Sequence, residues 1–416
     1  MKTDSHRYEN GVVTILAFAV GVMIFEQSSV NFLIPFIKPE LNLTNTQVGL
    51  LVSAYWATFA LSSFATGLLA DSIGSRKAVF IAIVVLLSLF SVLSGLANSF
   101  TQLLGARALM GLLEGPMLPI AQSIVVLESS VERRGINMGI VGSLGGTAFG
   151  FFVAPLVLVK IASIYGWRAG FFVAAVPGLI CALFAARLIR GLAPGRSAAH
   201  DAGVADRKSG GTLMEALSHR NVWICAVLCC LYVGYNSLGF AFLPLFYTTV
   251  RQMSSQQMSF LMSFVGIGAM AFSVLLPMLS DRIGRKGVMF AANLLSTLCP
   301  LAAIFYTGPM GGFVLFQLIG WTLSGTGSII TGTIPAETVP TRSVSTAMGL
   351  IVAFGVVGGG IVGPAFGGWA AEHWGLQVPV WIQIGCALTA SLLSAALRET
   401  APRKAGKPRG LLAATE

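Results

Sequence analysis

The chain has 416 residues, of which 55% are hydrophobic and only 10% are charged, and its mean hydropathy is +0.81. About 25% of the residues of a soluble globular domain are charged, so this composition excludes an ordinary soluble protein and predicts a polytopic membrane protein. The formal net charge is +10. The basic residues are spread over short loops rather than gathered in one patch with aromatic residues, so we expect no nucleic-acid partner.

Runs of about 20 apolar residues, the length that crosses the core of a bilayer, occur along the whole chain. Twelve such runs lie near residues 11–35, 47–70, 78–97, 102–127, 138–164, 168–189, 222–246, 256–279, 287–306, 311–334, 345–371 and 375–397. They predict an all-α membrane protein with twelve transmembrane helices.

The distribution of the 26 Lys and Arg residues predicts the orientation of these helices. When the spans are counted from a cytoplasmic N-terminus, nearly all basic residues fall on the cytoplasmic side. The exceptions are Lys38, Lys160, Arg168 and Arg251 on the opposite side and Arg107 inside a span. This asymmetry predicts a multi-pass protein of the plasma (inner) membrane, surrounded by lipid, with both termini in the cytoplasm.

The first apolar run is expected to be a retained helix rather than a signal peptide, because no small-residue cleavage site follows it and Glu26 interrupts it. All six cysteines lie in apolar spans and all four histidines lie outside them. This separation predicts packing cysteines, no metal site, no cofactor and no enzyme active site.

Two loops of the chain repeat one another. Residues 71–77 read DSIGSRK and residues 281–287 read DRIGRKG, at an offset of 210 residues. Internal repeats are typical of transporters. We therefore expect two pseudo-symmetric six-helix bundles, residues 1–190 and 221–397, joined by a polar cytoplasmic linker, residues 191–220, and followed by a basic cytoplasmic tail, residues 398–416.

The segment GLLADSIGSRK, residues 67–77, resembles the signature loop of the major facilitator superfamily, and PMLSDRIGRK, residues 277–286, resembles its weaker copy with Pro277 in place of the first glycine. Gly74 permits a tight turn, and Arg76 and Lys77 anchor the cytoplasmic face. The resemblance implies that Asp71 is a conformational latch; the alternative is a solvated carboxylate at a helix end. The predicted gate comprises Gly67, Asp71, Gly74, Arg76, Lys77, Asp281 and Arg285.

Glycines recur every fourth residue in the fifth and eleventh spans, a spacing that lets helices approach closely in lipid. They are Gly142, Gly146 and Gly150 in the fifth span and Gly355, Gly359, Gly363 and Gly367 in the eleventh. Static packing and a sliding surface for conformational change are both consistent with this pattern.

Glu26, Arg107 and Glu114 are the charged residues well inside the predicted spans. Each costs roughly 2.5–3.5 kcal/mol at a helix centre on insertion scales, so they should face a cavity and one another rather than lipid. Seven residues advance a helix by about 10.5 Å and return to nearly the same face, which places Arg107 and Glu114 on one wall at two depths. Arginine offers a planar fork of donors to an anion, and a carboxylate can carry a proton. A purely structural ion-paired network is the alternative.

The stretch RALMGLLEGPMLP, residues 107–119, also resembles the fourth helix of the anion:cation symporter branch of that superfamily. GWRAGFF (166–172), FLPLFY (242–247), IPAETVP (334–340) and GGIVGPAFGG (359–368) extend the resemblance. It implies that Arg107 binds an organic anion and that Glu114, with Glu26, couples transport to protons. Gln27 stands where the branch commonly has an arginine, which favours a smaller or singly charged anion over a sugar dicarboxylate.

Polar residues elsewhere in the spans complete the predicted pocket. The segment YVGYN, residues 232–236, lies in the half opposite Arg107 and is the strongest candidate. The predicted substrate-binding residues are Arg107, Gln27, Asn31, Tyr55, Tyr232, Tyr235 and Asn236.

These patterns predict a monomeric, proton-coupled symporter that takes up a small organic anion, a carboxylate, by alternating access. A proton/drug antiporter is the alternative within transport, although the fifth span has Ala154-Pro155 where such exporters usually carry a Gly-Pro pair. A membrane-embedded enzyme and a sensor that does not transport are further alternatives.

Overall fold

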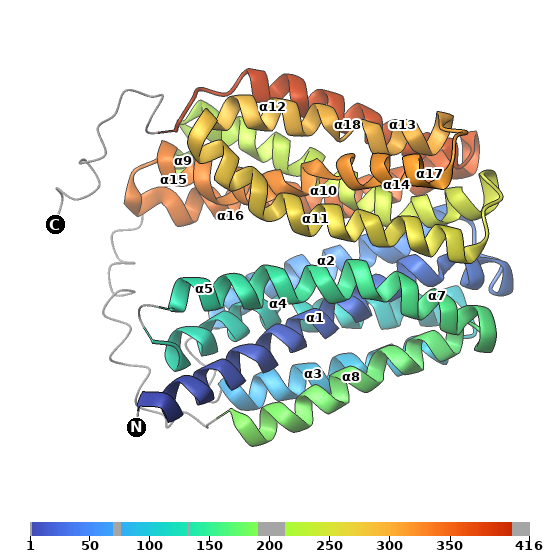
Figure 1. Ribbon diagram of the computed structural model, residues 1–416, viewed down its shortest axis with the longest axis horizontal. Helices are drawn as coiled ribbons and strands as arrows, with labels where there is room; N and C mark the ends of the chain where they lie inside the picture. The colour runs from blue at the N-terminus through green and yellow to red at the C-terminus, as the bar shows by residue number, and fades with distance from the viewer. Residues whose placement is uncertain (1, 70–75, 131–132, 190–212, 402–416) are drawn as a thin grey trace. The chain divides into compact units, whose positions relative to one another are not determined.

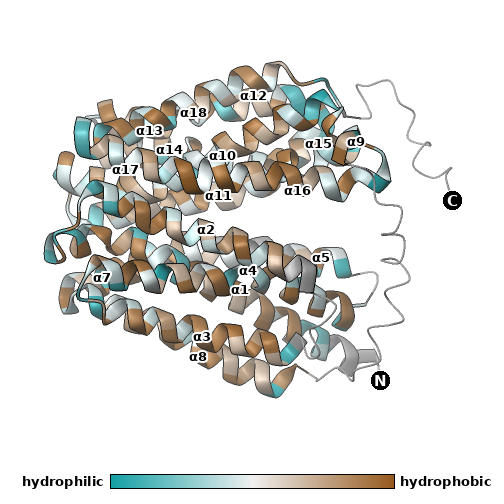
Figure 2. Cartoon of the chain, turned by 180° about the vertical axis from the view of Figure 1, so that it is seen from behind, coloured by the Kyte–Doolittle hydropathy of each residue, from teal (hydrophilic) through white to brown (hydrophobic). Residues whose placement is uncertain are grey.

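The computed structural model describes residues 2–69, 76–130, 133–189 and 213–401. Twelve helices in these ranges are long and apolar enough to cross a membrane, from Arg7–Glu40 to Gln377–Ala395. Apolar residues run along their length and polar residues gather near their ends (Figure 2). The prediction of an all-α protein with twelve transmembrane helices is confirmed, and the bounds differ from the predicted runs mainly at the ends.

The first half of the chain supplies six of these spans, from Arg7–Glu40 to Trp167–Leu188, and Figure 1 shows their arrangement. Its first four spans are α1 (Lys2–Glu40), α2 (Asn45–Leu69), α3 (Arg76–Gly95) and α4 (Phe100–Glu128). The fifth span is made of α5 (Arg134–Gly139), η2 (Ile140–Leu144), α6 (Gly145–Thr147), η3 (Ala148–Val153) and α7 (Ala154–Tyr165). The sixth span is α8 (Trp167–Leu188). The fifth span changes between α-helical and wider π-helical turns along its glycine-rich stretch, as expected where glycine weakens the regular helix.

The second half repeats this pattern. After the short helix α9 (Leu213–Leu217), the seventh span is α10 (Arg220–Leu245) with η6 (Phe246–Val250), the eighth is α11 (Ser255–Ile283), and the ninth is α12 (Arg285–Leu295) with α13 (Leu298–Phe305). The tenth span is made of α14 (Met310–Ile319), η7 (Thr322–Thr326), η8 (Ile329–Thr333) and α15 (Ile334–Thr338). The eleventh is made of η9 (Thr341–Ser343), α16 (Val344–Phe354), η10 (Gly355–Val362) and α17 (Gly363–Trp374), and the twelfth is α18 (Gln377–Ala395). The second glycine-rich span is again interrupted by π-helical turns, at η10.

By their contacts, the described residues form two compact units. Unit 1 comprises the described residues of Met1–Gly203, Phe240–Ile267 and Ala365–Leu376, and unit 2 those of Val204–Gly239, Gly268–Pro364 and Gln377–Glu416. Each unit has its own buried apolar core, one built on α1, α3, α4 and α8 and the other on α10, α15, α16 and α18. The bundle boundaries expected from the repeat remain a prediction, and part of the expected linker is helical, because residues 213–217 form α9.

The glycine ridges pack against the first long helix of their own half. A Cβ atom on Gly150 would lie 2.1 Å from Cγ2 of Ile24 in α1. A Cβ atom on Gly359 would lie 2.4 Å from the backbone oxygen of Cys230 and 2.4 Å from the backbone nitrogen of Gly234, both in α10. A close approach therefore occurs in both halves. At Gly359 it requires glycine, because the facing atoms are backbone and cannot move aside as a flexible side chain can.

Replacing Gly359 by valine is expected to destabilise unit 2, because the new side chain would overlap the backbone of α10. Overpacking of this kind costs about 1–3 kcal/mol. A lower Tm of the purified protein in detergent would measure it. Gly349→Val is the matched control, since a Cβ atom on the exposed Gly349 in α16 has nothing within 4 Å. Equal Tm values for the two variants would show that this close approach contributes nothing to stability.

Candidate functional site

The three charged residues expected inside the membrane are all buried in unit 1. Glu26 is 1% exposed, Arg107 2% and Glu114 1%. Arg107 and Glu114 lie on α4, and Glu26 lies on α1. None of the ion pairs recorded among the described residues includes any of the three. Among the described residues, no direct ion pair therefore joins these three side chains.

Arg107 is fixed in position without a carboxylate partner. Its Nη2 donates to the backbone oxygen of Gln27 at 2.9 Å, and its Nη1 lies 3.7 Å from Sδ of Met110, a weak acceptor. The guanidinium carbon lies 5.0 Å from the centre of the Tyr55 ring, an arrangement that attracts a cation to the aromatic face. Its Nε has no hydrogen-bond partner among the described residues. The arginine is thus oriented, yet keeps donor capacity for an anion.

Glu114 is connected to Arg107 through Tyr55. The Tyr55 hydroxyl donates to Oε2 of Glu114, while Oε1 of Glu114 has no partner among the described residues. The same tyrosine therefore touches the arginine with its ring and the carboxylate with its hydroxyl. The sequence placed Arg107 and Glu114 on one wall at two depths; the structure adds the residue that joins them.

Two glycines of α4 bring Tyr55 within reach of Glu114. A Cβ atom on Gly111 would lie 2.3 Å from the backbone oxygen of Tyr55, and one on Gly115 would lie 2.1 Å from Oγ of Ser62. Small residues at such positions let two membrane helices approach closely. The pattern Gly-x-x-Glu-Gly in α4 thus sets both the contact with α2 and the position of the carboxylate in it.

The carboxylate of Glu26 contacts α3 and α8. Its Oε1 accepts a hydrogen bond from Ser88 of α3 at 3.1 Å, and a Cβ atom on Gly178 of α8 would lie 3.2 Å from that oxygen. Successive helical residues point about 100° apart, so Glu26 turns toward α3 and α8 while its neighbour Gln27 meets Arg107 with its backbone. Glu26 is a buried carboxylate, as predicted, but its recorded contact is with Ser88.

The remaining predicted residues of α1 are Gln27 and Asn31. Gln27 and Asn31 are four residues apart, so they share a helix face, and both are half-buried. The structure records no hydrogen bond for either side-chain amide among the residues it describes. Tyr55 is 2% exposed. Unit 1 thus contains four of the seven predicted substrate-binding residues, namely Gln27, Asn31, Tyr55 and Arg107.

Tyr232, Tyr235 and Asn236 belong to unit 2, on α10. Asn236 accepts a hydrogen bond from Ser324 at 3.2 Å through Oδ1 and donates to the backbone oxygen of Tyr232 at 2.8 Å. Tyr232 is half-buried against Gly327. These two residues face η7 and the turn after it.

Tyr235 is placed differently from the expectation that it lines a pocket. It is fully buried, and its hydroxyl donates to the backbone oxygens of Ser296 at 2.8 Å and Gly320 at 3.0 Å. Its ring packs on Trp321 at 5.1 Å between ring centres. The hydroxyl serves packing inside unit 2, because its one proton is taken by backbone carbonyls.

The predicted gate is described only in part. Asp71 and Gly74 lie outside the described residues, and for Gly67 and Arg76 only the helical backbone is described. Lys77 donates through Nζ to the backbone oxygen of Ala186 at 2.8 Å, near the C-terminal end of α8. A cation at a helix C-terminus is favourable, and this contact agrees with an anchoring role.

The second copy of the loop is described in full. Arg285 is buried and donates through Nη2 and Nε to the two carboxylate oxygens of Glu337, at 2.8 and 3.3 Å. Its Nη1 bonds to Asp281 and donates to Ser280 at 2.7 Å. Asp281 therefore pairs with Arg285 of its own loop. The bidentate partner of Arg285 is Glu337, which lies in the segment IPAETVP and is not among the predicted gate residues.

Glu399 is a further residue that sequence reasoning missed. Its carboxylate accepts from the backbone N–H groups of Arg285 at 2.8 Å and Lys286 at 3.3 Å, so it caps the start of α12. Burial alone would raise the pKa of Glu399, but the backbone donors, Ala401 among them, outweigh it and hold the pKa below its usual value. This contribution to stability is present at neutral pH and is lost as the pH falls through the folded-state pKa.

A contact between α2 and α17 inside unit 1 was also missed. The backbone N–H of Asn45, the first residue of α2, donates to Oε2 of Glu372 at 2.6 Å, and Nδ2 of Asn45 donates to the backbone oxygen of Ala371 at 3.2 Å. Lys38 bonds to Oδ1 of Asn45. Asn45 and Glu372 are 327 residues apart, so nothing local in the sequence could pair them.

Comparisons with known proteins agree with this architecture. The sequence matches the Major Facilitator Superfamily over residues 16–327 and 240–414. It is similar to the hexuronate transporter of Bacillus subtilis (strain 168), with 27% identity over 316 residues and 72% of each chain covered. It is also similar to the probable 4-methylmuconolactone transporter of Cupriavidus pinatubonensis (strain JMP 134 / LMG 1197), with 26% identity over 71% of this chain and 70% of that one.

A crystal structure of a point mutant of the nucleoside transporter NupG has the same fold, with a TM-score of 0.78, 16% identity, and 94% of this chain and 99% of that one covered. The described residues contain no group of three or more His, Cys, Asp or Glu side chains that could hold a metal ion. Family and fold are those of transporters and not of enzymes. The chain is a multi-pass integral membrane protein that belongs to the major facilitator superfamily.

Proposed function

We propose that this transporter is a symporter that takes up a small organic anion together with protons, by alternating access. The observation that carries the proposal is Arg107: a buried guanidinium, oriented by Gln27 and Tyr55, with an unpartnered Nε and no carboxylate ion pair among the described residues. A buried charge is costly unless it is paired. An anionic substrate supplies the missing partner, and the forked donors of arginine suit a carboxylate.

Glu114 is the proposed proton carrier. Its negative charge, held close to Arg107 by Tyr55, disfavours a second anion at the same place. Protonation removes that charge, so proton binding and anion binding each favour the other, and this coupling is reciprocal in free energy. Glu26, the second buried carboxylate of unit 1, is proposed to contribute, although its recorded contact is with Ser88 and not with Tyr55.

The proposed substrate is a monocarboxylate that also carries hydroxyl or carbonyl groups. Arg107 supplies one cationic contact, and the amides of Gln27 and Asn31 on the adjoining face of α1 can bond neutral polar groups. The names of the two relatives above, a transporter of hexuronate and one of methylmuconolactone, are consistent with this class. Tyr232 and Asn236 are also proposed to bind the substrate.

The remaining features of the proposal follow from charge and pattern. We place the protein in the plasma (inner) membrane as a monomer, with both termini in the cytoplasm. The two signature loops are proposed to act as a conformational gate, through Gly67, Asp71, Gly74, Arg76 and Lys77 in the first loop and Asp281 and Arg285 in the second.

Uptake into proteoliposomes tests the proposal. With acid outside and neutral buffer inside, we expect labelled glucuronate, a hexuronate, or another monocarboxylate of similar size to accumulate above its outside concentration, and a protonophore to abolish the accumulation. A panel of monocarboxylates and dicarboxylates in a thermal-unfolding assay selects the substrate beforehand, because a ligand that binds only the folded state stabilises it by RT ln(1 + [L]/Kd).

Two results would contradict the proposal. Accumulation that is unaffected by the protonophore would remove proton coupling. Proton release from the vesicles on addition of a lipophilic cation, with no uptake of any carboxylate in the panel, would instead identify a proton/drug antiporter.

A further inference from the structure

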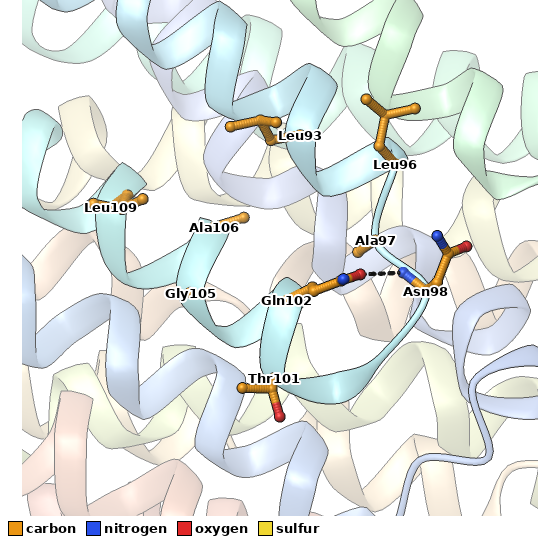
Figure 3. A pocket seen from close by; sticks show the side chains of 9 residues that line it. All are labelled: Leu93, Leu96, Ala97, Asn98, Thr101, Gln102, Gly105, Ala106 and Leu109. Carbon is orange, nitrogen blue, oxygen red and sulfur yellow. Dashed lines mark hydrogen bonds between the residues drawn. The ribbon is translucent and has the colours of Figure 1, made fainter.

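A surface groove lies between the end of α3 and the beginning of α4. None of its lining residues has a role in the proposed transport mechanism. It has a volume of about 440 Å³, within the range of about 300–1,000 Å³ that is usual for small-molecule sites. Leu93, Leu96 and Leu109 form its apolar walls, and Asn98, Thr101 and Gln102 form a polar end (Figure 3). An amphipathic groove on membrane-spanning helices suits an amphipathic ligand.

The apolar part is open to the surroundings of the protein. Leu93 is 48% exposed, Leu96 55% and Leu109 43%. Leu93 and Leu96 lie at the end of α3, and Leu109 lies in the first half of α4. Both helices are apolar enough to cross a membrane, so an acyl chain can cover these side chains. Gly105 contributes a bare stretch of α4 to the groove, and a Cβ atom there has nothing within 4 Å.

The polar end offers hydrogen-bond donors. The backbone N–H of Asn98 donates to Oε1 of Gln102 at 2.8 Å (Figure 3). This bond orients the Gln102 amide so that its NH₂ group stays available. Oδ1 of Asn98 accepts from Arg168 at 3.1 Å, which leaves the NH₂ group of Asn98 available as well. Such groups can donate to phosphate or ester oxygens.

A pair of opposite charges adjoins this polar end. Arg168 of α8 donates to Asn98 and, at 3.3 Å, to the backbone oxygen of Ala97, and its guanidinium lies 4.3 Å from the centre of the Trp167 ring. Arg168 also pairs with Glu40, whose other oxygen accepts from Nε1 of Trp167 at 2.7 Å. The side chains of Arg168 and Glu40 are 33% and 50% exposed. A fixed cation that bonds to two lining residues of the groove, Ala97 and Asn98, thus stands beside a fixed anion.

We propose that this groove is a binding site for a zwitterionic phospholipid with a primary ammonium headgroup, such as phosphatidylethanolamine. The acyl chain lies along Leu93, Leu96 and Leu109, the phosphate meets Arg168 and the amide of Asn98, and the ammonium donates to Glu40. The neutral sum of the charge pair disfavours a lipid with a net charge. A quaternary ammonium is disfavoured too, because it has no N–H to donate.

Lipid-dependent thermal stability of the purified protein, combined with native mass spectrometry of the retained lipid, tests this site. For the wild type we expect phosphatidylethanolamine to raise the Tm more than phosphatidylcholine or phosphatidylglycerol does. Gly105→Leu places a large side chain in the groove at a position where a Cβ atom meets nothing within 4 Å, and it should lose this extra shift. Gly311→Leu is the matched control, since Gly311 in α14 is exposed and a Cβ atom there also has nothing within 4 Å.

A second variant tests the charge pair independently of the groove. Glu40→Gln leaves Arg168 without its anion, so the preference should move from phosphatidylethanolamine to phosphatidylglycerol by several-fold in apparent Kd. Equal shifts by the three lipids in the wild type would overturn the proposal, as would an undiminished phosphatidylethanolamine shift in Gly105→Leu or an unchanged lipid order in Glu40→Gln. None of these readouts depends on transport.

Discussion

Replacing Arg107 by lysine is expected to weaken substrate binding by about 10- to 100-fold in Kd. Lysine keeps the positive charge but loses the planar fork that bonds both oxygens of a carboxylate. A hydrogen bond to a charged group contributes about 1.5–3 kcal/mol, which corresponds to that range. The protein should still fold, because the lysine ammonium can replace the bond that Arg107 donates to the backbone oxygen of Gln27. Calorimetric or thermal-shift titration with the monocarboxylate selected from the panel measures the loss.

Arg187→Lys is the matched control, because Arg187 lies in the last turn of α8 and is exposed. It should bind as the wild type does. An unchanged Kd in Arg107→Lys would place the anion site elsewhere in the transporter, and a similar loss in both variants would show that the effect is not specific to the buried arginine.

The sequence predicted the spans well because crossing a bilayer imposes a single strong requirement. Every backbone polar group in the apolar core must be bonded within its own helix, so about 20 apolar residues in a row mark a helix with little dependence on its neighbours. The fifth and eleventh spans show where this signal is incomplete. Their glycine-rich stretches read as continuous helices, yet the structure changes to π-helical turns at η2, η3 and η10.

The sequence also identified Arg107 and Glu114, because a charge inside an apolar span is costly and therefore informative. It could place the two on one face of α4 by helical geometry alone. Tyr55 is among the predicted substrate-binding residues, but the sequence alone does not show that it connects Arg107 with Glu114. That connection depends on α2 being the neighbour of α4, and on Gly111 and Gly115 allowing the close approach.

Residues on other helices were harder to place for the same reason. Glu26 and Gln27 are adjacent in sequence, yet the Glu26 carboxylate bonds to Ser88 of α3 while the backbone oxygen of Gln27 bonds to Arg107 of α4. The segment YVGYN predicts a pocket residue at Tyr235, but only the packing of Ser296, Gly320 and Trp321 around it shows that its hydroxyl already bonds to backbone oxygens. Composition and periodicity describe one helix at a time, whereas these contacts are properties of pairs of helices.

Replacing Glu114 by glutamine is expected to abolish uphill transport while leaving exchange intact. Glutamine resembles the protonated acid in shape and lacks the negative charge, so the anion can still bind at Arg107 and the loaded carrier can still change its orientation. The variant has no proton to release, so a gradient of one pH unit, which supplies about 1.4 kcal/mol per proton and supports about tenfold accumulation, should produce none. Counterflow of labelled substrate into preloaded vesicles, measured beside gradient-driven uptake, separates the two activities.

Glu26→Gln is the informative companion to Glu114→Gln. Both substitutions remove a buried carboxylate from unit 1, but the Glu26 carboxylate bonds to Ser88 while Glu114 shares Tyr55 with the anion-binding arginine. We therefore expect Glu26→Gln to keep gradient-driven uptake at a reduced level. A merely structural role for Glu114 predicts that folding, or counterflow and accumulation together, are damaged in Glu114→Gln. Full accumulation in both single variants would refute either carboxylate as an indispensable proton carrier, because a coupled symporter cannot work against a gradient without releasing the proton that it bound.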